Sequence, residues 1–339
     1  MGNSVLVIGN GFDIAHSLKT SYNDFIDSAM EYAEKTDSNN TYENKYIYLC
    51  QNNGFMKAFI KRGKIEKWVD VEKEIKIIVE KIEEFMSDDY EVIGINGKYR
   101  ISINDIFLRE RLLDFGILDA TEYQETGQLY FESQFFDKEY NINRKAIVSK
   151  MEEELNGLIN CFEIYLMHIM PEIRIKPIEQ IKKIDPAYII SFNYTDTYVK
   201  YNFDLIDAFH IHGKIGMNNI VLGMDDDDED KLEFVSFKKY FQRIEKKTGF
   251  LNEEAFVMEK DAHNGVDIKR DVYFYGHSLD ITDADTIEQI KNLSETMYIF
   301  YRENEDDYKN QVKNLIAIFG KRNTIDMVQK GKIVFKKVT

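Results

Sequence analysis

The sequence has little of several features that would place it in a narrow class of protein. Its 339 residues contain only two cysteines, Cys50 and Cys161, far apart in the chain, so neither a disulfide framework nor a cysteine metal site is predicted. No apolar run approaches the roughly 20 residues that a membrane-spanning helix needs. The segment Met1–Ser4 lacks the basic and apolar regions of a signal peptide. These absences predict a cytoplasmic protein with no membrane partner.

Basic charge is also scarce. Lys and Arg number 44 against 60 Asp and Glu, a net charge of −16. Phosphate contacts supply most of the affinity for nucleic acids, so nucleic acid is an unfavoured partner. The 44% of hydrophobic residues and 13% of aromatic residues are enough for a sizeable core.

The distribution of apolar residues predicts an α/β protein with an inserted helical block. The run Ser4–Ile8 is continuous, which is typical of a strand buried on both faces. From Thr20 to about residue 184 the apolar spacing is mostly helical, with a short hairpin indicated around Asn96-Gly97. Strands and helices then alternate, which favours a parallel sheet. The strand-like runs after the helical block are Tyr188–Phe192, Ala208–Ile211, Ile220–Leu222, Val272–Tyr275, Met297–Tyr301 and Ile333–Phe335.

These patterns divide the chain into two parts. Residues 1–30 and 185–339 are predicted to form a Rossmann-like domain with a mostly parallel sheet. Residues 31–184 are predicted to form a mainly helical insertion, because a block of that length is too large for an ordinary crossover between parallel strands.

A glycine-rich turn, Gly9-Asn10-Gly11-Phe12-Asp13, follows the first predicted strand directly. Two glycines let the backbone turn tightly and approach a ligand, and a helix starting there would direct free N–H groups at a phosphate. The full dinucleotide fingerprint needs a third glycine, where this chain has Ile14. A tight turn without a ligand is the alternative.

Two further segments turn polar where a predicted strand ends. Ser191–Asp196 follows one apolar run, and His210-Ile211-His212-Gly213 follows the next. Side chains at the carboxyl ends of such strands converge on the ligand crevice of an open α/β sheet. Asn193 would orient a water or a ribose hydroxyl, or else stabilise its own turn. His212 would act as a general base near neutral pH, or else be a packed or capping residue at the strand end.

His210 and His212 also have the spacing of a metal-binding pair on a strand, but no third ligand is evident, so no metal is predicted. The run Asp225–Asp230 lacks the spacing and glycine of a calcium loop and is expected to be a solvated loop.

The segment Gly276-His277-Ser278-Leu279-Asp280 is similar to the nucleophile elbow of serine hydrolases. No histidine follows Ser278 in the chain, so the usual order of the triad is unavailable and esterase chemistry is not favoured. Ser278 would bond a nucleotide or cap a helix. Asp280, Asp283 and Asp285 are expected to be helix-start carboxylates. Asp70 and Glu72, after Trp68, are likewise expected at a helix start.

Taken together, these motifs resemble those of the bacteriophage abortive-infection AbiH family. The resemblance covers nearly the whole chain and is carried by Gly9–Asp13 with Ser21-Tyr22 and Phe25, Trp68–Glu72, Phe192–Thr195, His210–Gly213 and Gly276–Leu279. Membership implies a role in bacterial defence against phage, in which an infected cell stops growing or dies.

At greater distance the motifs are similar to the sirtuin-like NAD-binding fold. The Gly-Ala-Gly-x-Ser turn of that fold resembles Gly9–Asp13, and its Thr-x-Asn-x-Asp strand end resembles Ser191–Asp196. Its His-Gly pair and Gly-x-Ser-Leu turn resemble His212-Gly213 and Gly276–Leu279. The chain departs from the pattern at Asp13, which replaces a serine, and at Thr195, which occupies the acidic position with Asp196 one residue late.

This second resemblance implies NAD as substrate or ligand, with cleavage between nicotinamide and ribose. Asn193 and His212 would be catalytic, placing the attacking water and contacting a ribose hydroxyl or deprotonating the nucleophile. The residues implied to contact the nucleotide are Gly9, Asn10, Gly11, Phe12, Asp13, Asp196, Gly213, Gly276, His277 and Ser278.

Two other functions stay open from the residues alone. The chain could be a nucleotide-binding sensor without turnover, acting through a partner such as a phage-derived trigger or by self-association. Less favoured is a metal-dependent hydrolase or nuclease built on His210, His212 and nearby aspartates.

Overall fold

The computed structural model describes residues 4–63, 70–88, 90–95, 98–136, 141–171, 177–201, 203, 206–224, 232–260, 267–302 and 305–338. The chain forms two compact units. Unit 1 comprises Met1–Ser21, Met170–Val221 and Arg243–Thr339, and unit 2 comprises Tyr22–Ile169 and Leu222–Gln242. Trp68, the turn Asn96-Gly97 and the acidic run Asp225–Asp230 lie outside the described residues.

Unit 1 contains a six-stranded sheet in the order β11-β10-β9-β1-β5-β6, with every neighbouring pair parallel. Numbered along the chain, this is the 3-2-1-4-5-6 order of dinucleotide-binding Rossmann folds. The predicted parallel α/β fold is therefore confirmed. The strands are β1 (Ser4–Ile8), β5 (Pro186–Ser191), β6 (Asp207–His210), β9 (Asp271–Tyr275), β10 (Met297–Tyr301) and β11 (Ile333–Lys337).

One predicted strand is wrong. Ile220, Val221 and Leu222 are buried but form no strand. The side chain of Gln242 takes the place of a neighbouring strand at Leu222, accepting from its N–H at 3.1 Å and donating to its carbonyl at 2.9 Å. A glutamine side chain thus satisfies the backbone groups that a ladder would otherwise pair.

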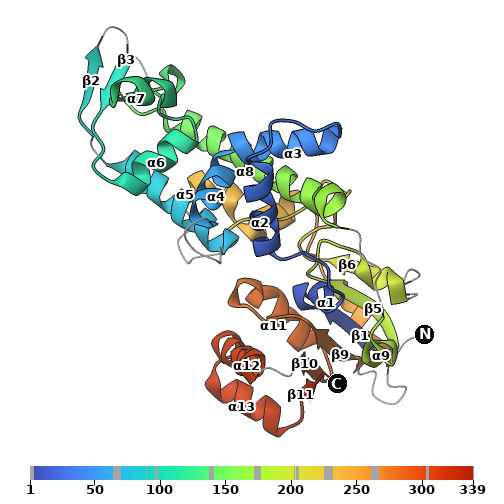
Figure 1. The fold of residues 1–339 in the computed structure, drawn as a ribbon. Coiled ribbons are helices and arrows are strands. Elements are labelled where there is room, and N and C mark those ends of the chain that lie inside the picture. Colours follow the sequence, from blue (N-terminus) through green and yellow to red (C-terminus); the bar gives the residue numbers. More distant parts are fainter. Residues whose placement is uncertain are drawn as a thin grey trace. The chain divides into compact units, whose positions relative to one another are not determined.

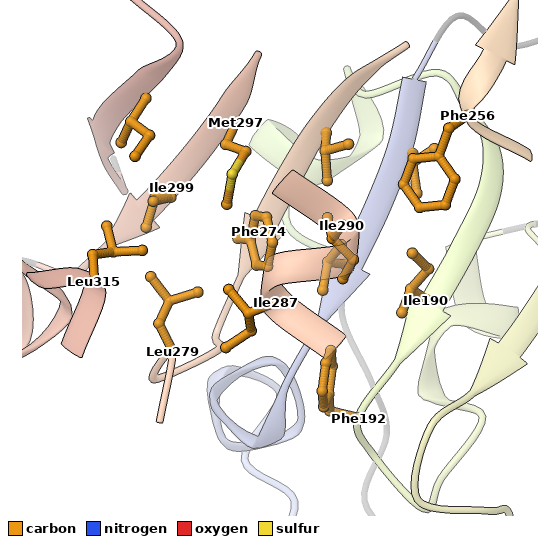
Figure 2. Packing of buried hydrophobic residues seen from close by; sticks show 14 of the residues in the cluster. Ile190, Phe192, Phe256, Phe274, Leu279, Ile287, Ile290, Met297, Ile299 and Leu315 are labelled. Carbon is orange, nitrogen blue, oxygen red and sulfur yellow. The ribbon is translucent and has the colours of Figure 1, made fainter. Parts of the chain in front are cut away.

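The central strand β1 separates two hydrophobic cores. Its side chains alternate, so Val5 and Val7 join one buried cluster while Leu6 and Ile8 join the other. All four are fully buried, which stabilises the unit by about 1.5–3 kcal/mol for each side chain. Figure 2 shows the first cluster, in which Ile287 and Ile290 pack beside Phe274.

Helices cover both faces of this sheet (Figure 1). α11 (Ala284–Leu293) and α12 (Glu305–Phe319) contribute to the first cluster, and α1 (Asn10–Ala15) and α9 (Glu179–Lys182) to the second. The remaining elements of this part of the chain are α10 (Lys239–Glu245), the hairpin strands β7 (Val257–Lys260) and β8 (Asp267–Lys269), and α13 (Lys321–Gln329).

Unit 2 is mainly helical, as the apolar spacing predicted. The helix start expected at Asp70 and Glu72 begins α5, and the longest helix of the unit is α8, which continues into a π-helical turn over Tyr165–Ile169. The helices are α2 (Tyr22–Tyr32), α3 (Thr41–Asn52), α4 (Gly54–Gly63), α5 (Val71–Ser87), α6 (Ile106–Asp114), α7 (Ala120–Thr126) and α8 (Arg144–Ile164). No helix among the described residues is both long enough and apolar enough to cross a bilayer.

A small antiparallel sheet completes unit 2. The predicted hairpin is confirmed by the pairing of β2 (Val92–Ile95) with β3 (Lys98–Ile101), and β4 (Leu129–Phe131) adds a third strand. Cys50 and Cys161, distant in sequence, face each other as free thiols in this unit with 4.0 Å between the sulfur atoms.

Candidate functional site

The two glycine turns of unit 1 meet at the point where the strand order reverses. Gly9–Phe12 follows β1 and Gly276–Leu279 follows β9, and these two strands are neighbours. The N–H of Gly9 donates to the carbonyl of Tyr275 at 3.2 Å, and that of Gly11 donates to the carbonyl of Gly276 at 2.8 Å. Ligands of open α/β sheets bind at the carboxyl ends of strands beside such a reversal.

Contact between the two turns explains why both contain glycine. A Cβ atom on Gly9 would lie 2.7 Å from the Cα of His277, and one on Gly11 would lie 2.8 Å from the Cα of Gly276. Gly276 has a φ of +69°, and a Cβ there would lie 2.1 Å from the amide nitrogen of Phe12. The close packing of the two turns therefore requires these glycines with or without a ligand. The Gly11 N–H, which the sequence analysis expected to face a phosphate, donates to the Gly276 carbonyl instead.

Asp13 lies at the centre of a buried polar cluster. Its side chain is 1% exposed, and the hydroxyl of Thr195 donates to its Oδ2 at 2.5 Å. The hydroxyls of Thr195 and Thr197 are 3.1 Å apart. Burial raises the pKa of the Asp13 carboxyl, and the hydrogen bonds from both threonines offset part of that rise.

Asn193 is the least satisfied side chain of this cluster. Neither its Oδ1 nor its Nδ2 has a partner within hydrogen-bonding geometry, although the residue is only 4% exposed, and the same holds for the buried Oδ1 of Asp13. The Asn193 side chain does lie close enough to the Asp13 carboxyl to lower its pKa, so this contact is weaker than a well-formed hydrogen bond. The backbone of Asn193 is firmly held, because its carbonyl accepts from Ser191 Oγ at 3.0 Å and from His210 Nδ1 at 3.2 Å. An unpaired buried polar atom costs about 1–3 kcal/mol, so three such atoms in one cluster require a physical explanation.

His212 lies in a second polar cluster of the same unit. Its Nε2 is 2.9 Å from Oδ1 of Asp283, and the other oxygen, Oδ2, is 3.6 Å from Nε2 of His277. All three side chains are buried. The ring of Phe192 packs edge-on against both imidazoles, with centroid distances of 5.5 Å to His212 and 4.1 Å to His277.

Sequence reasoning missed the contact made by Asp283. It expected Asp280, Asp283 and Asp285 to serve a helix start, and Asp280 does accept from the Thr282 N–H at 3.2 Å. Asp283 occupies the N-cap position of α11, yet its carboxylate makes no cap hydrogen bond. Its side chain contacts the histidines instead. One helix start does not need three aspartates for capping, so their number could have indicated that one of them has another role.

His210 and His212 have separate partners and do not form a pair. Nδ1 of His210 donates to the Asn193 carbonyl, and Nε2 lies 3.2 Å from the Tyr198 hydroxyl. Burial lowers the pKa of His210, which favours a neutral ring with both nitrogens engaged. Across the described ranges, no group of three or more His, Cys, Asp or Glu side chains has an arrangement that would hold a metal ion.

Two of the other residues predicted to contact the nucleotide, Phe12 and Gly213, are buried in the protein. Phe12 is a core residue whose ring is tilted against those of His16 and Tyr201 and edge-on to that of Tyr275. Gly213, with a φ of +80°, packs against the Asn219 carbonyl in a tight turn.

Three more of these residues are at least partly exposed. Asn10 is exposed and accepts from the Thr20 hydroxyl at 2.7 Å. Asp196 has a half-exposed carboxylate 3.0 Å from Lys214 Nζ. Ser278 is exposed, and its carbonyl accepts from Asn314.

The structure brings Asn193 together with Asp13, and His212 together with Asp283 and His277. It forms no hydrogen bond between the Asn193 side chain and His212. The two clusters are joined along the chain at the Phe192–Asn193 peptide, since Phe192 contacts the imidazoles while the next residue belongs to the Asp13 cluster.

Comparison with known families agrees with this arrangement of motifs. A sequence model described as bacteriophage abortive infection AbiH matches residues 5–301. The chain belongs to the AbiH family. Membership indicates a role in phage abortive infection, as the motif resemblance implied. The match spans β1 to β10 and includes both polar clusters of this AbiH protein. No curated protein and no solved structure matches the chain.

Proposed function

We propose that this AbiH protein is an abortive-infection effector that binds NAD at the carboxyl edge of the unit 1 sheet and cleaves its nicotinamide–ribose bond. Loss of NAD would stop phage replication together with the host cell. The strand order supports the proposal, because dinucleotides bind across the crevice where a 3-2-1-4-5-6 sheet reverses.

One observation carries the proposal: the amide of Asn193 and the Oδ1 of Asp13 are buried and unpaired. Together they offer one donor group and two acceptor atoms. A ribose hydroxyl or a carboxamide both donates and accepts, so either group of NAD would satisfy such atoms. Satisfying them on binding recovers free energy that the unliganded protein lacks.

The reaction needs only water as a second substrate. The bond from C1′ of the ribose to the nicotinamide nitrogen breaks, and both bonding electrons leave with the nitrogen, which neutralises the pyridinium charge. The resulting oxocarbenium-like ribose takes up water, and the water loses one proton, giving nicotinamide, ADP-ribose and a proton. In this scheme Asn193 places the water and His212 accepts its proton.

A second candidate is a sensor that holds NAD without turning it over. The deep burial of Asn193 and Asp13 favours it, because a site closed to solvent retains a ligand while excluding the water that hydrolysis needs. The sensor would be stabilised thermally by NAD and would leave the NAD intact.

Infection of cells that carry the protein separates these functions. The NAD content and plaque count are measured for the native chain, for Asn193→Ala and for Asn323→Ala, an exposed asparagine of the same unit. Cleavage predicts that NAD falls after infection with the native chain and with Asn323→Ala, and that Asn193→Ala loses both the fall and the protection. Protection with unchanged NAD in the native cells would reject the enzyme in favour of the sensor.

A further inference from the structure

The carboxylate of Asp283 lies between two buried imidazoles and contacts one nitrogen of each. Its Oδ1 is 2.9 Å from Nε2 of His212, and its Oδ2 is 3.6 Å from Nε2 of His277. A helix N-cap aspartate ordinarily accepts from the first backbone N–H groups of its helix, and Asp283 does not. Its side chain is directed to the histidines at the expense of the cap.

The tautomer of His277 follows from its backbone contact. The N–H of Leu279 donates to Nδ1 of His277 at 2.9 Å, so that nitrogen must present its lone pair. The ring proton of a neutral His277 is therefore on Nε2, which faces Asp283. One oxygen of the carboxylate thus lies 3.6 Å from this N–H group, beyond hydrogen-bonding distance but close enough for electrostatic attraction.

The same reasoning assigns the proton of His212. A carboxylate accepts hydrogen bonds and does not donate them, so the 2.9 Å contact requires an N–H at Nε2 of His212. The lone pair of the neutral ring is then on Nδ1. Nδ1 makes no hydrogen bond with any residue that the structure describes.

We infer that Asp283 is the positioning residue of this site: it fixes His212 in the Nε2–H tautomer and thereby makes Nδ1 the atom that accepts a proton from the substrate or water. The inference rests on the proposed function of His212 as a base. The nitrogen opposite the carboxylate is free to act, and the carboxylate stabilises the imidazolium that forms when Nδ1 takes up a proton.

Exchange of Asp283 for asparagine tests the inference in a defined way. The amide keeps the size of the carboxylate but has one oxygen, so it must present its NH₂ group to one of the two imidazoles. Because the Leu279 N–H keeps the ring proton of His277 on Nε2, that ring cannot accept from the NH₂ group, which therefore faces His212. The lone pair of His212 then moves to Nε2 and its proton to Nδ1. Asp283→Asn is then expected to reduce NAD cleavage by about 10²–10⁴-fold, the range seen when a base holds the wrong tautomer. Asp285→Asn, two residues away and largely exposed, is the matched control.

The tautomer itself is measured by ¹⁵N NMR on protein labelled only at its six histidines, with His212 assigned from a His212→Gln spectrum. The native chain should show a protonated Nε2 and an unprotonated Nδ1 for His212, and Asp283→Asn should change this pair of signals while Asp285→Asn does not. An unprotonated Nε2 in the native chain, or an unchanged His212 in Asp283→Asn, would overturn the inference. If the native chain shows the predicted spectrum but does not cleave NAD, the proposed reaction is refuted, whereas the effect of Asp283 on the His212 tautomer is confirmed.

Discussion

Thr195 donates a 2.5 Å hydrogen bond to the carboxylate of Asp13, 182 residues earlier in the chain. These are the two positions at which the sequence departs from the sirtuin-like pattern, which has a hydroxyl at the first and an acid at the second. In this chain the acid is at the first position and the hydroxyl at the second, and the two side chains are bonded to each other. Two departures that look independent in the sequence are one contact in the fold.

The buried carboxyl of Asp13 predicts a pH-dependent effect of Asp13→Asn. Burial raises the folded-state pKa of Asp13 above its ordinary 3.8. Protonation of this group therefore contributes stability that is fully present below pH 3.8 and is lost as pH rises through the raised pKa. Asparagine cannot ionise and can still accept from Thr195.

We expect Asp13→Asn to be more stable than the native chain at neutral pH by about 1 kcal/mol or more, because the amide avoids a buried ionised carboxyl. The difference should shrink toward zero as the pH falls below 3.8. Urea denaturation at several pH values measures it. A variant less stable than the native chain at neutral pH would show that the ionised carboxylate is favoured in the fold.

Asn193→Leu should separate stability from function. Leucine has nearly the shape of asparagine and no polar atoms to leave unpaired, so the buried penalty of about 1–3 kcal/mol disappears. The melting temperature should stay level or rise, while NAD binding is lost. A marked fall in melting temperature would mean that the Asn193 amide is hydrogen-bonded in the folded protein and is not available to a ligand.

Substitution by alanine should destabilise the protein by different amounts at two glycines that share the same backbone conformation. Gly276 and Gly331 have φ values of +69° and +71°, but a Cβ at Gly331 meets nothing within 4 Å. Gly331→Ala should therefore cost only the left-handed conformation, about 1–2 kcal/mol. Gly276→Ala adds a collision with the backbone of Phe12 and should cost at least about 3 kcal/mol. Denaturation followed by circular dichroism gives both values, and equal costs would rule out a tight contact between the turns.

Much of the unit 1 sheet could be predicted from the sequence because its strands are buried. Continuous apolar runs located β1, β9, β10 and β11, and alternation with helices indicated parallel pairing. The same criterion failed at Ile220–Leu222, since burial alone does not distinguish a strand from an irregular segment held by the side chain of Gln242.

The candidate site was only partly predictable, because its contacts are between residues distant in the sequence. Strand ends pointed to Asn193 and His212, and both side chains are buried. The pairing of His212 with Asp283 spans 71 residues, and no local pattern distinguishes Asp283 from the neighbouring aspartates. Likewise the sequence could not show that the Asn193 amide lies with Asp13 and that His212 lies in a different cluster.

The AbiH motif around Glu72 predicts a structural role in unit 2. Lys239 Nζ is 2.6 Å from one carboxylate oxygen of Glu72, and the Tyr22 hydroxyl donates to the other at 3.2 Å, while Asp70 caps α5. Lys239 is only 5% exposed at its side chain, so removing the negative charge of Glu72 breaks a buried ion pair. Glu72→Gln should therefore cost about 3–5 kcal/mol, whereas Glu80→Gln, whose partner Lys76 is 3.9 Å away at an exposed site, should cost less than about 0.5 kcal/mol.

Fluorescence of the single tryptophan, Trp68, which belongs to the same unit, follows the unfolding in urea. Similar midpoints for the two variants would exclude the buried pair as a source of stability. If only Glu72→Gln unfolds early, Tyr22→Phe should fall between the two, because it removes one hydrogen bond to the carboxylate and leaves the ion pair in place.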